Sequence, residues 1–321
     1  MDRDSVNIRV VTDGRPGNAT QAMGLAEALA RRLPAQIDEQ VVRLKPVFRV
    51  LPQRVAALFG RGAFAAGPAF EGTPDLVIGA GRRGNLAAAA LRRGGARAVA
   101  ILDPQMATAD FDAVIVPGHD RLRGPNVLTT LGALNRLGGR VLTPPEALPA
   151  LPAPRLALLI GGPSRSARFD RAALARLLED LAAFEGWSVL ATPSRRTPAW
   201  VVAEIRAARP DAWIWDGEGE NPYPGMLGAA QAIMVTEDSV NMTSEAAVTG
   251  KPVHVSGLGR IDAKFLRFHA ALRARGITRP AAEGPGMWSY TPLAETERMA
   301  AMLCERLGLA AAFPSAAPLP I

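Results

Sequence analysis

Short apolar runs alternate with amphipathic stretches along nearly the whole chain. The apolar runs predict buried strands at residues 9–13, 40–44, 75–79, 98–102, 113–116, 156–160, 188–191, 212–215, 232–235 and 252–255. The amphipathic stretches predict helices at residues 20–33, 85–93, 170–184, 198–208, 222–230, 241–249, 263–275 and 293–307. Residues 47–72 fit neither pattern. Because strands that alternate with helices form parallel sheets covered on both faces, the pattern predicts an α/β fold.

A proline-rich segment divides this pattern into two halves. Five prolines fall between Pro144 and Pro154, a density that neither a helix nor a central strand accommodates. We interpret the segment as an extended interdomain linker, with one long surface loop as the alternative. The prediction is therefore two doubly wound α/β domains, residues 1–148 and 149–321.

Composition narrows the class of protein. The chain has 321 residues, of which 48% are hydrophobic and 21% charged, so it can build sizeable cores. It contains no apolar run of the ~20 residues that span a bilayer, and its N-terminus lacks the apolar stretch of a secretory signal. The lone Cys304 excludes an internal disulfide. These features predict a cytoplasmic protein.

Arginine dominates the charge. Lysine and arginine total 37 against 30 acidic residues, which gives a formal net charge of +7. Residues 1–150 hold 19 of the basic and 13 of the acidic residues, so most of the excess lies in the first half. A basic face attracts anionic lipid, nucleic acid or phosphorylated substrates. Because only 5% of the residues are aromatic, stacking platforms for bases are scarce, and we expect no nucleic-acid partner.

Ligands of open parallel sheets bind beyond the carboxyl ends of the strands, so the residues after each predicted strand are the candidates for chemistry. Two domains of this kind are expected to face a cleft lined by both sets of strand ends. In the first half the candidates are Asp13, Gly14, Arg15, Gly17, Asn18 and His119. In the second half they are Gly161, Gly162, Ser164, Arg165, Ser194, Arg195, Glu237, Asp238, Ser239, Asn241, Met242 and Glu245.

The candidates of the second half suit a nucleotide, although each has a structural alternative. Glycine amides with Ser164 and Arg165 suit a phosphate, as does the Arg195 guanidinium, but both loops could be plain turns. The helix that begins near Ser239 presents free amides to a diphosphate, and Glu245 one turn later could accept hydrogen bonds from a ribose diol. A well-capped helix without a ligand would have the same features.

Acid–base groups are few. His119 and Asp13 follow strands and are the candidate catalytic bases. We expect His254, inside a strand, to be structural, and His269, in a helix, to lie on the surface. No group of Asp, Glu, His or Cys has the spacing of a metal site, so we expect no metal cofactor.

Six motifs in order resemble the elongated-mitochondria (mitochondrial fission) protein family, which comprises plant proteins and many bacterial members described as glycosyltransferases. The motifs are DGRPGNATQAMGL, GGPSRSARFD, SRRTP, WDGEGENPYPGML, VTEDSVNMTSEAAVTGKPVHV and KFLRFH. The resemblance extends from Asp13 to about Arg279. It implies a glycosyltransferase-like protein rather than a particular reaction.

One of these motifs has a wider resemblance. DSVNMTSEAAVTGKPV is similar to the donor-site motif of GT-B glycosyltransferases, such as the lipid-linked N-acetylglucosaminyltransferase of peptidoglycan synthesis. By this resemblance two Rossmann-like domains face a cleft, and the last helix packs back on the first domain. Glu245 holds the nucleotide ribose, and Ser239 with its neighbours holds the diphosphate. The chain departs from that motif at Ser239-Val240, where the enzyme has glycine and alanine.

The resemblance implies transfer of a sugar from a nucleotide-diphosphate sugar, without a metal, to a lipid-linked or cell-envelope glycan. The second half would bind the donor, and the basic first half would hold the acceptor. The protein would then lie peripherally at the inner face of the cytoplasmic membrane. Asp13 or His119 would be the base of an inverting enzyme. One alternative is a non-catalytic adaptor, as the plant relatives are thought to be. The other is a nucleotide-sugar epimerase that uses Glu218, Glu220, Asp238 and His119. No oligomeric state is predicted.

Overall fold

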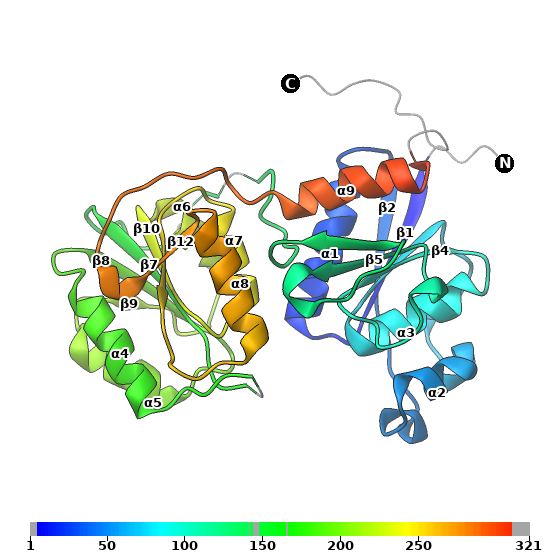
Figure 1. Cartoon of the computed structure of the whole chain (residues 1–321), viewed down its shortest axis with the longest axis horizontal. Helices are drawn as coiled ribbons and strands as arrows, with labels where there is room; N and C mark the ends of the chain where they lie inside the picture. The colour runs from blue at the N-terminus through cyan, green and yellow to red at the C-terminus, as the bar shows by residue number, and fades with distance from the viewer. Residues whose placement is uncertain (1–4, 141, 144–147, 165, 310–321) are drawn as a thin grey trace. The chain divides into compact units, whose positions relative to one another are not determined.

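The computed structural model describes residues 5–140, 142–143, 148–164 and 166–309. The chain forms two compact units (Figure 1). The first unit consists of Met1–Gly138 and Ala294–Ile321, and the second consists of Gly139–Leu293. The chain therefore leaves the first unit after Gly138 and returns to it at Ala294.

The first unit is built on a sheet whose described strands run in the order β2-β1-β3-β4-β5-β6. Every neighbouring pair in this sheet is parallel. The strands are β1 (Val6–Thr12), β2 (Ala35–Val41), β3 (Leu76–Ala80), β4 (Arg97–Ile101), β5 (Ala113–Pro117) and β6 (Val127–Thr130). From β1 the chain continues to β2 on one side, whereas β3 to β6 follow one another on the other side of β1. The switch point, where ligands of such sheets bind, therefore lies between β1 and β3.

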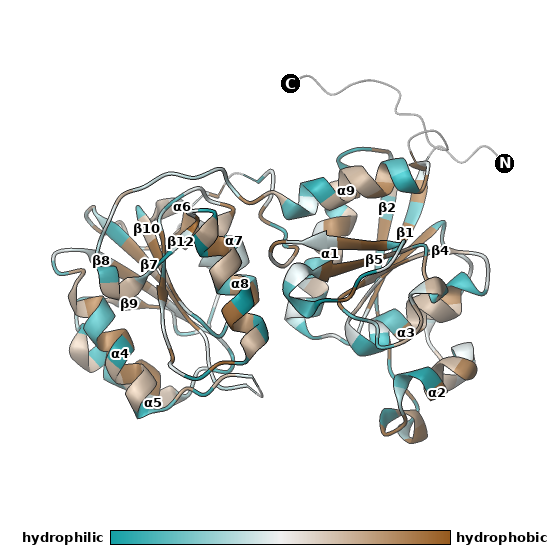
Figure 2. Ribbon diagram, viewed as in Figure 1, coloured by the Kyte–Doolittle hydropathy of each residue, from teal (hydrophilic) through white to brown (hydrophobic). Residues whose placement is uncertain are grey.

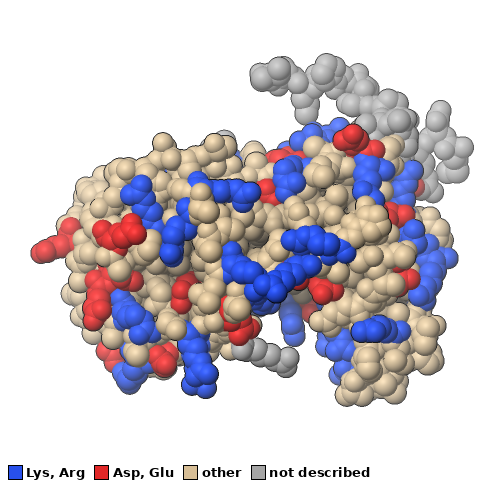
Figure 3. All heavy atoms as spheres, in the orientation of Figure 1, with Lys and Arg blue, Asp and Glu red and all other residues tan. Residues whose placement is uncertain are grey.

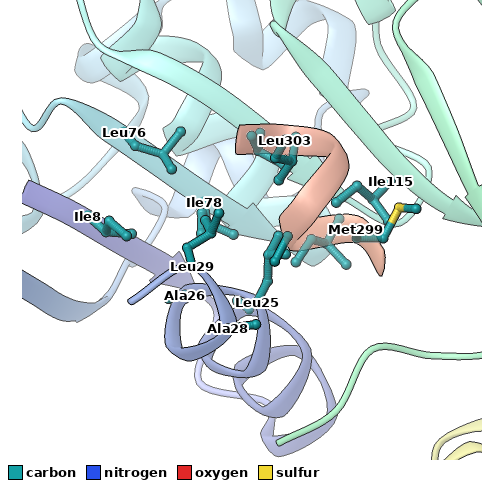
Figure 4. Packing of buried hydrophobic residues seen from close by; sticks show 14 of the residues in the cluster. Ile8, Leu25, Ala26, Ala28, Leu29, Leu76, Ile78, Ile115, Met299 and Leu303 are labelled. Atoms are coloured by element: carbon teal, nitrogen blue, oxygen red, sulfur yellow. The ribbon is translucent and has the colours of Figure 1, made fainter. Parts of the chain in front are cut away.

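Helices cover both faces of this sheet. One apolar cluster joins the strands to α1 (Pro16–Ala30) and α9 (Glu295–Arg306), and the other joins them to α2 (Gln53–Leu58) and α3 (Gly81–Arg92). Figure 4 shows Met299 of α9 beside Ile115 of the sheet, in the same cluster as Leu25 of α1. All three side chains are fully buried. The last helix of the chain thus completes a core whose strands lie in the first half of the sequence.

The second unit has its own parallel sheet, whose described strands run in the order β12-β11-β10-β7-β8-β9. The strands are β7 (Arg155–Ile160), β8 (Ser188–Pro193), β9 (Trp213–Ile214), β10 (Ala232–Thr236), β11 (Val253–Ser256) and β12 (Thr278–Pro280). The helices are α4 (Arg171–Ala182), α5 (Ala199–Ala208), α6 (Tyr223–Ala229), α7 (Val240–Ala247) and α8 (Ala263–Ala274). In this unit the switch point lies between β7 and β10.

The apolar residues lie inside both units, as Figure 2 shows by the brown strands under more mixed helices. In the second unit α4 and α5 lie on one side of the sheet, with α7 and α8 on the other. Short 3-10 helices connect the larger elements: η1 (Pro46–Arg49), η2 (Gly60–Ala63), η3 (Pro68–Phe70), η4 (Thr108–Asp110), η5 (Gly118–Asp120) and η6 (Ala281–Glu283). None of the described helices is both long and apolar enough to cross a membrane.

The prediction of two doubly wound α/β units is confirmed, but several element bounds differ. The strand expected at residues 40–44 is wrong, because β2 occupies Ala35–Val41 and alternates half-buried and exposed side chains at the sheet edge. The edge strands β6 and β12 were not predicted for the same reason. The helix expected at 20–33 begins at Pro16, whose fixed backbone suits a first helical position. Of the proline-rich segment, 148–154 has no helix or strand, and 144–147 lies outside the described residues.

His254 of β11 is a buried ionisable group without a hydrogen bond. Neither ring nitrogen has a partner among the described residues. The ring instead meets Phe184 and Trp288 edge to face, with centroid distances of 5.0 and 4.9 Å. Burial, together with the nearby charge of Arg279, lowers the pKa of His254 from 6.5 to about 4. The folded protein therefore holds this imidazole neutral, as expected for a structural histidine.

Replacement of His254 by leucine is expected to reduce the acid sensitivity of the fold. Below about pH 6.5 the unfolded chain binds a proton that the folded chain excludes, so stability falls as the pH drops toward about 4, by up to about 3 kcal/mol. Urea unfolding at about pH 7 and about pH 5 measures this slope in both proteins. Equal losses of stability in wild type and His254→Leu would show that another group is responsible.

Candidate functional site

Three loops meet at the carboxyl-end edge of the second sheet, around its switch point. They follow β7, β8 and β10, which are neighbours in the sheet. The loops contain Gly161 and Gly162, then Ser194 to Thr197, then Glu237 to Ser239. Most of the candidates of the second half lie on these loops.

The Asp238 carboxylate joins the three loops. Its side chain is fully buried. One oxygen, Oδ2, accepts from the Gly162 amide at 3.0 Å and from Nη2 of Arg196 at 2.9 Å, and Oδ1 accepts from the Thr236 hydroxyl at 2.7 Å. The Thr236 oxygen in turn accepts from the Gly161 amide at 2.8 Å. A buried charge with several charge-assisted and backbone partners is stabilised where an unpaired one would be costly.

The two glycines serve this close approach. A Cβ atom on Gly161 would lie 2.0 Å from Oδ1 of Asp238, and one on Gly162 would lie 2.3 Å from the Arg196 carbonyl oxygen. Both amides already have partners inside the protein. We therefore assign Gly161 and Gly162 to loop packing, whereas the sequence suggested that their amides bind phosphate.

The two arginines of this turn differ in their contacts. The Arg196 side chain is 42% exposed, but its guanidinium reaches back to donate to the carbonyls of Gly162 and Pro163 and to Asp238. Arg195 is exposed in the same turn. Ser194 accepts from the Arg196 amide at 3.3 Å and pairs with Thr197 at 3.0 Å, so its hydroxyl shapes the turn. Nothing in the surrounding sequence distinguishes Arg196, which bonds within the protein, from Arg195, whose side chain has no such bond among the described residues.

In the loop after β7, Ser164 is exposed and its hydroxyl accepts from the Ser166 amide at 3.1 Å. It acts as a turn residue there. Arg165, the other phosphate candidate of this loop, lies outside the described residues.

Helix α7 begins at the switch point with a capped first turn. Ser239 is its N-cap, and its hydroxyl accepts from the Met242 amide at 3.3 Å. The Thr243 amide donates to the Ser239 carbonyl, which leaves the amides of Val240 and Asn241 without a partner among the described residues. These amides lie at the positive end of the helix, where an anion is favoured.

Glu245 follows on the same helix and is held by a tyrosine. The hydroxyl of Tyr223, from α6, donates to Oε2 of Glu245 at 2.8 Å. Burial raises the pKa of Glu245 from 4.5 to about 7, and the pKa of Tyr223 also rises well above its usual value. Glu245 lies six positions after Ser239, which places the two residues about 9 Å apart along the helix axis. The carboxyl group, whose pKa is about 7, therefore lies on the same helix as an end that favours anions.

Glu237 holds the loop that follows β11. Its Oε1 accepts from the amides of Leu258 and Gly259 at 2.6 and 3.1 Å. Its carbonyl oxygen lies 2.7 Å from Nε2 of His269. The expectation that His269 lies on the surface is wrong, because α8 turns Phe268, His269 and Leu272 inward together and the imidazole is buried.

The carboxyl-end edge of the first unit has a smaller network. Oδ1 of Asp13 accepts from the Asn18 side-chain amide at 2.9 Å and from the Arg15 amide at 3.2 Å. The Asn18 amide lies over Gly81, where a Cβ atom would be 2.2 Å from Nδ2. Asp13 and Asn18 therefore connect the loops that follow β1 and β3, at the switch point of this sheet.

The remaining first-unit candidates flank this network. Gly14 donates its amide to the Thr12 hydroxyl at 3.1 Å, and Gly17 lies in the first turn of α1. Arg15 is exposed. His119 is buried after β5, with Nε2 3.9 Å from Asp120. Because β3 and β4 separate β5 from β1, Asp13 and His119 are three strand spacings apart, about 14 Å.

A hollow that the sequence did not predict opens beside this edge. Its volume is about 860 Å³, and it is lined by Val50, Leu51, Pro52, Gln53, Arg54, Arg82, Asp103, Gln105, Met106 and Ala107. Leu102 and Gln105, in the loop after β4, have positive φ angles of 70° and 53°. Strained residues of this kind often mark functional loops. The signal in the sequence was the GxGxxG pattern of Gly79, Gly81 and Gly84, which extends from the end of β3 into the first turn of α3.

The carboxylates of the epimerase alternative are not gathered in the second unit. Glu218 and Glu220 lie in an exposed loop after β9, whereas Asp238 is fully bonded within the buried network. The site geometry thus gives no support to an arrangement of these three groups around one sugar.

Replacement of Asp238 by alanine is expected to lower the free energy of unfolding by about 3 kcal/mol, because Arg196, Thr236 and Gly162 each lose a partner. The matched control is Arg195→Ala, an exposed change in a loop of the same network, which is expected to stay within about 0.5 kcal/mol of wild type. Urea unfolding compares the three proteins. Equal stability of Asp238→Ala and wild type would mean that the loops do not depend on this carboxylate.

Comparison with known sequences identifies relatives over most of the chain. Residues 16–307 match the sequence model of the family described as Mitochondrial fission ELM1. "Mitochondrial fission protein ELM1" of Arabidopsis thaliana is 33% identical over 275 residues, which cover 73% of this chain and 64% of that protein. The chain therefore spans less than two thirds of that relative's length. "Uncharacterized protein RP120" of Rickettsia prowazekii is 27% identical, over 93% of this chain and 98% of the relative.

Solved structures share the fold at low sequence identity. The UDP-GlcNAc 2-epimerase of Neisseria meningitidis, bound to UDP-GlcNAc, has a TM-score of 0.56 at 13% identity and covers 94% of this chain and 100% of its own. The glycotransferase of kitacinnamycin has a TM-score of 0.53 at 16% identity and covers 96% and 95%. Similarity at this level shows the fold alone, and it confirms the predicted GT-B-like α/β architecture.

Proposed function

Because the chain belongs to the mitochondrial fission ELM1 family and has the fold of glycosyltransferases and related epimerases, we propose that it transfers a sugar from a nucleotide-diphosphate sugar. One observation carries the proposal. Helix α7 places unpartnered amides at its first turn and, one and a half turns later, a half-buried carboxyl group that accepts a hydrogen bond from Tyr223. The amides would donate to the diphosphate of a nucleotide, and the carboxyl group would accept hydrogen bonds from its ribose, in the order in which the two parts follow each other in the nucleotide.

The donor would bind along α7. Its diphosphate would lie at the first turn, near Ser239, Asn241 and Met242, where the helix dipole favours negative charge. Its ribose hydroxyls would donate to Glu245. As the sugar leaves, charge develops on the diphosphate, and the helix end with the exposed Arg195 would stabilise that charge without a metal.

The acceptor would bind at the edge of the first unit, beside Gly14, Arg15, Gly17 and Asn18. Asp13 and His119 remain the candidate bases. Asp13 is favoured because it lies at the switch point of its sheet, next to exposed Arg15, whereas His119 is three strands away. The hollow lined by Arg54, Arg82 and Asp103 offers room for a glycan, and we expect a lipid-linked or cell-envelope acceptor.

The second candidate function is a non-catalytic adaptor. The observation that favours it is the 33% identity to a plant protein named for mitochondrial fission. An adaptor does not require a nucleotide site, so donor binding separates the two functions.

A panel of nucleoside diphosphates and nucleotide sugars is expected to contain one family that raises the thermal midpoint. A ligand at a hundredfold excess over its Kd adds about 2.7 kcal/mol to the folded state. We expect the increase to disappear in Glu245→Ala and to persist in Glu185→Ala, which removes an exposed carboxylate elsewhere in the second unit. No increase with any nucleotide, in a folded wild type, would contradict the donor site and favour the adaptor.

The affinity for that nucleotide is expected to rise with pH. Glu245 is largely protonated below its pKa of about 7, and ribose hydroxyls donate to the charged form, so binding releases a proton. Isothermal titration between about pH 6 and about pH 8 should therefore show tighter binding at the higher pH, levelling off above about pH 7.5. Glu245→Gln should bind with little pH dependence. A wild-type affinity that falls with pH would mean that a different group contacts the ligand.

A further inference from the structure

The segment between β2 and β3 exposes its large apolar side chains. In α2 the buried residues are Gln53, Ala56 and Ala57. Val55, Leu58 and Phe59 lie on the opposite side and are 39%, 78% and 56% exposed. An amphipathic helix of a soluble domain normally turns its large apolar residues inward. Here small residues face the core and large ones face outward.

The preceding 3-10 helix enlarges this apolar area. The Phe59 ring lies 5.0 Å from the Phe48 ring, which places η1 next to the end of α2. Val47 and Val50 around η1 are 59% and 84% exposed. We call the area formed by Val47, Val50, Val55, Leu58 and Phe59 the α2 surface. It holds five of the nine large apolar side chains that are exposed among the described residues, within thirteen consecutive positions.

Positive charge surrounds the α2 surface. Residues 40–70 contain no aspartate or glutamate, and their basic residues are Arg43, Lys45, Arg49, Arg54 and Arg61. All five are exposed. The segment that carries the exposed apolar side chains therefore also carries a cluster of cations. In Figure 3 the end of the first unit that bears α2 is mostly uncharged, with blue side chains beside it.

These cations are not neutralised within the protein. Arg49 and Arg61 donate to the backbone carbonyls of Leu44 and Phe70. Among the described residues none of the five lies in a salt bridge with a carboxylate. Their charge is therefore available to an external anion.

We propose that the α2 surface docks the protein on an anionic lipid bilayer. The apolar side chains would enter the boundary between headgroups and acyl chains, and the surrounding cations would lie among anionic headgroups. A second copy of the chain fits less well, because it would bring the same five uncompensated cations against these five. The surface shares Val50 with the hollow proposed for the acceptor but no residue with the donor helix, so this inference does not depend on nucleotide binding.

Vesicle co-sedimentation tests the proposal on the full chain. We expect wild type to bind vesicles of equal parts phosphatidylglycerol and phosphatidylcholine, to bind pure phosphatidylcholine weakly, and to lose affinity as salt rises. The double variant Leu58→Ser/Phe59→Ser removes the apolar contact and should bind at least tenfold more weakly. The double variant Arg49→Glu/Arg54→Glu should lose the preference for phosphatidylglycerol. All four positions are exposed, and thermal unfolding verifies that each variant is folded.

Matched controls lie in the second unit. Leu266→Ser removes another exposed leucine, and Arg206→Glu/Arg273→Glu reverses two exposed charges. Both controls, together with Glu245→Ala, should bind vesicles as wild type does. The proposal is overturned if folded wild type ignores anionic vesicles, or if the α2 variants and the controls bind alike. A concentration-dependent dimer that Leu58→Ser/Phe59→Ser abolishes, without vesicle binding, would assign the surface to a second copy instead. Failure of nucleotide binding would leave these results unchanged.

Discussion

The Asp238 carboxylate is fully buried, yet its hydrogen-bond partners come from loops far apart in the sequence. A charge in such a place is stable only when it is paired and hydrogen-bonded, so the loops after β7, β8 and β10 must adopt the positions that supply its partners. Gly161 and Gly162 permit this approach because no side chain could fit there. The Gly162 amide donates to this carboxylate and the Gly161 amide donates to Thr236, so both glycine amides already have partners within the protein.

The first unit uses the same kind of contact on a smaller scale. Asp13 accepts from Asn18, and Asn18 lies against Gly81 at the start of α3. In each unit an acidic side chain after a central strand therefore holds a second strand-end loop across the switch point, and a glycine makes room for it. Exposed side chains flank both networks: Arg15, which is paired with Asp13 at 3.5 Å, in the first unit and Arg195 in the second.

The sequence predicted both sheets because central parallel strands are buried on two faces and appear as continuous apolar runs. Edge strands such as β2 are half exposed, so their mixed pattern has no such signal. The strand-end loops were also predictable, but the inward turn of Arg196 rather than Arg195 was not, since it depends on the backbone direction within one tight turn. Helix α2 was not predicted at all, because it lies within residues 47–72, which fit neither the helical nor the strand pattern, so its inner face of Ala56 and Ala57 could not be predicted either.

The first unit is discontinuous in the chain, because α9 follows the whole second unit and yet contributes Met299, Ala300 and Leu303 to the core around α1. During synthesis the ribosome releases every residue of the second unit before it releases these three. The second unit can therefore fold while the first still waits with part of its apolar face uncovered. A chain that stopped between Leu293 and Met299 would contain the whole second unit but a first unit without the side chains that complete its core around α1.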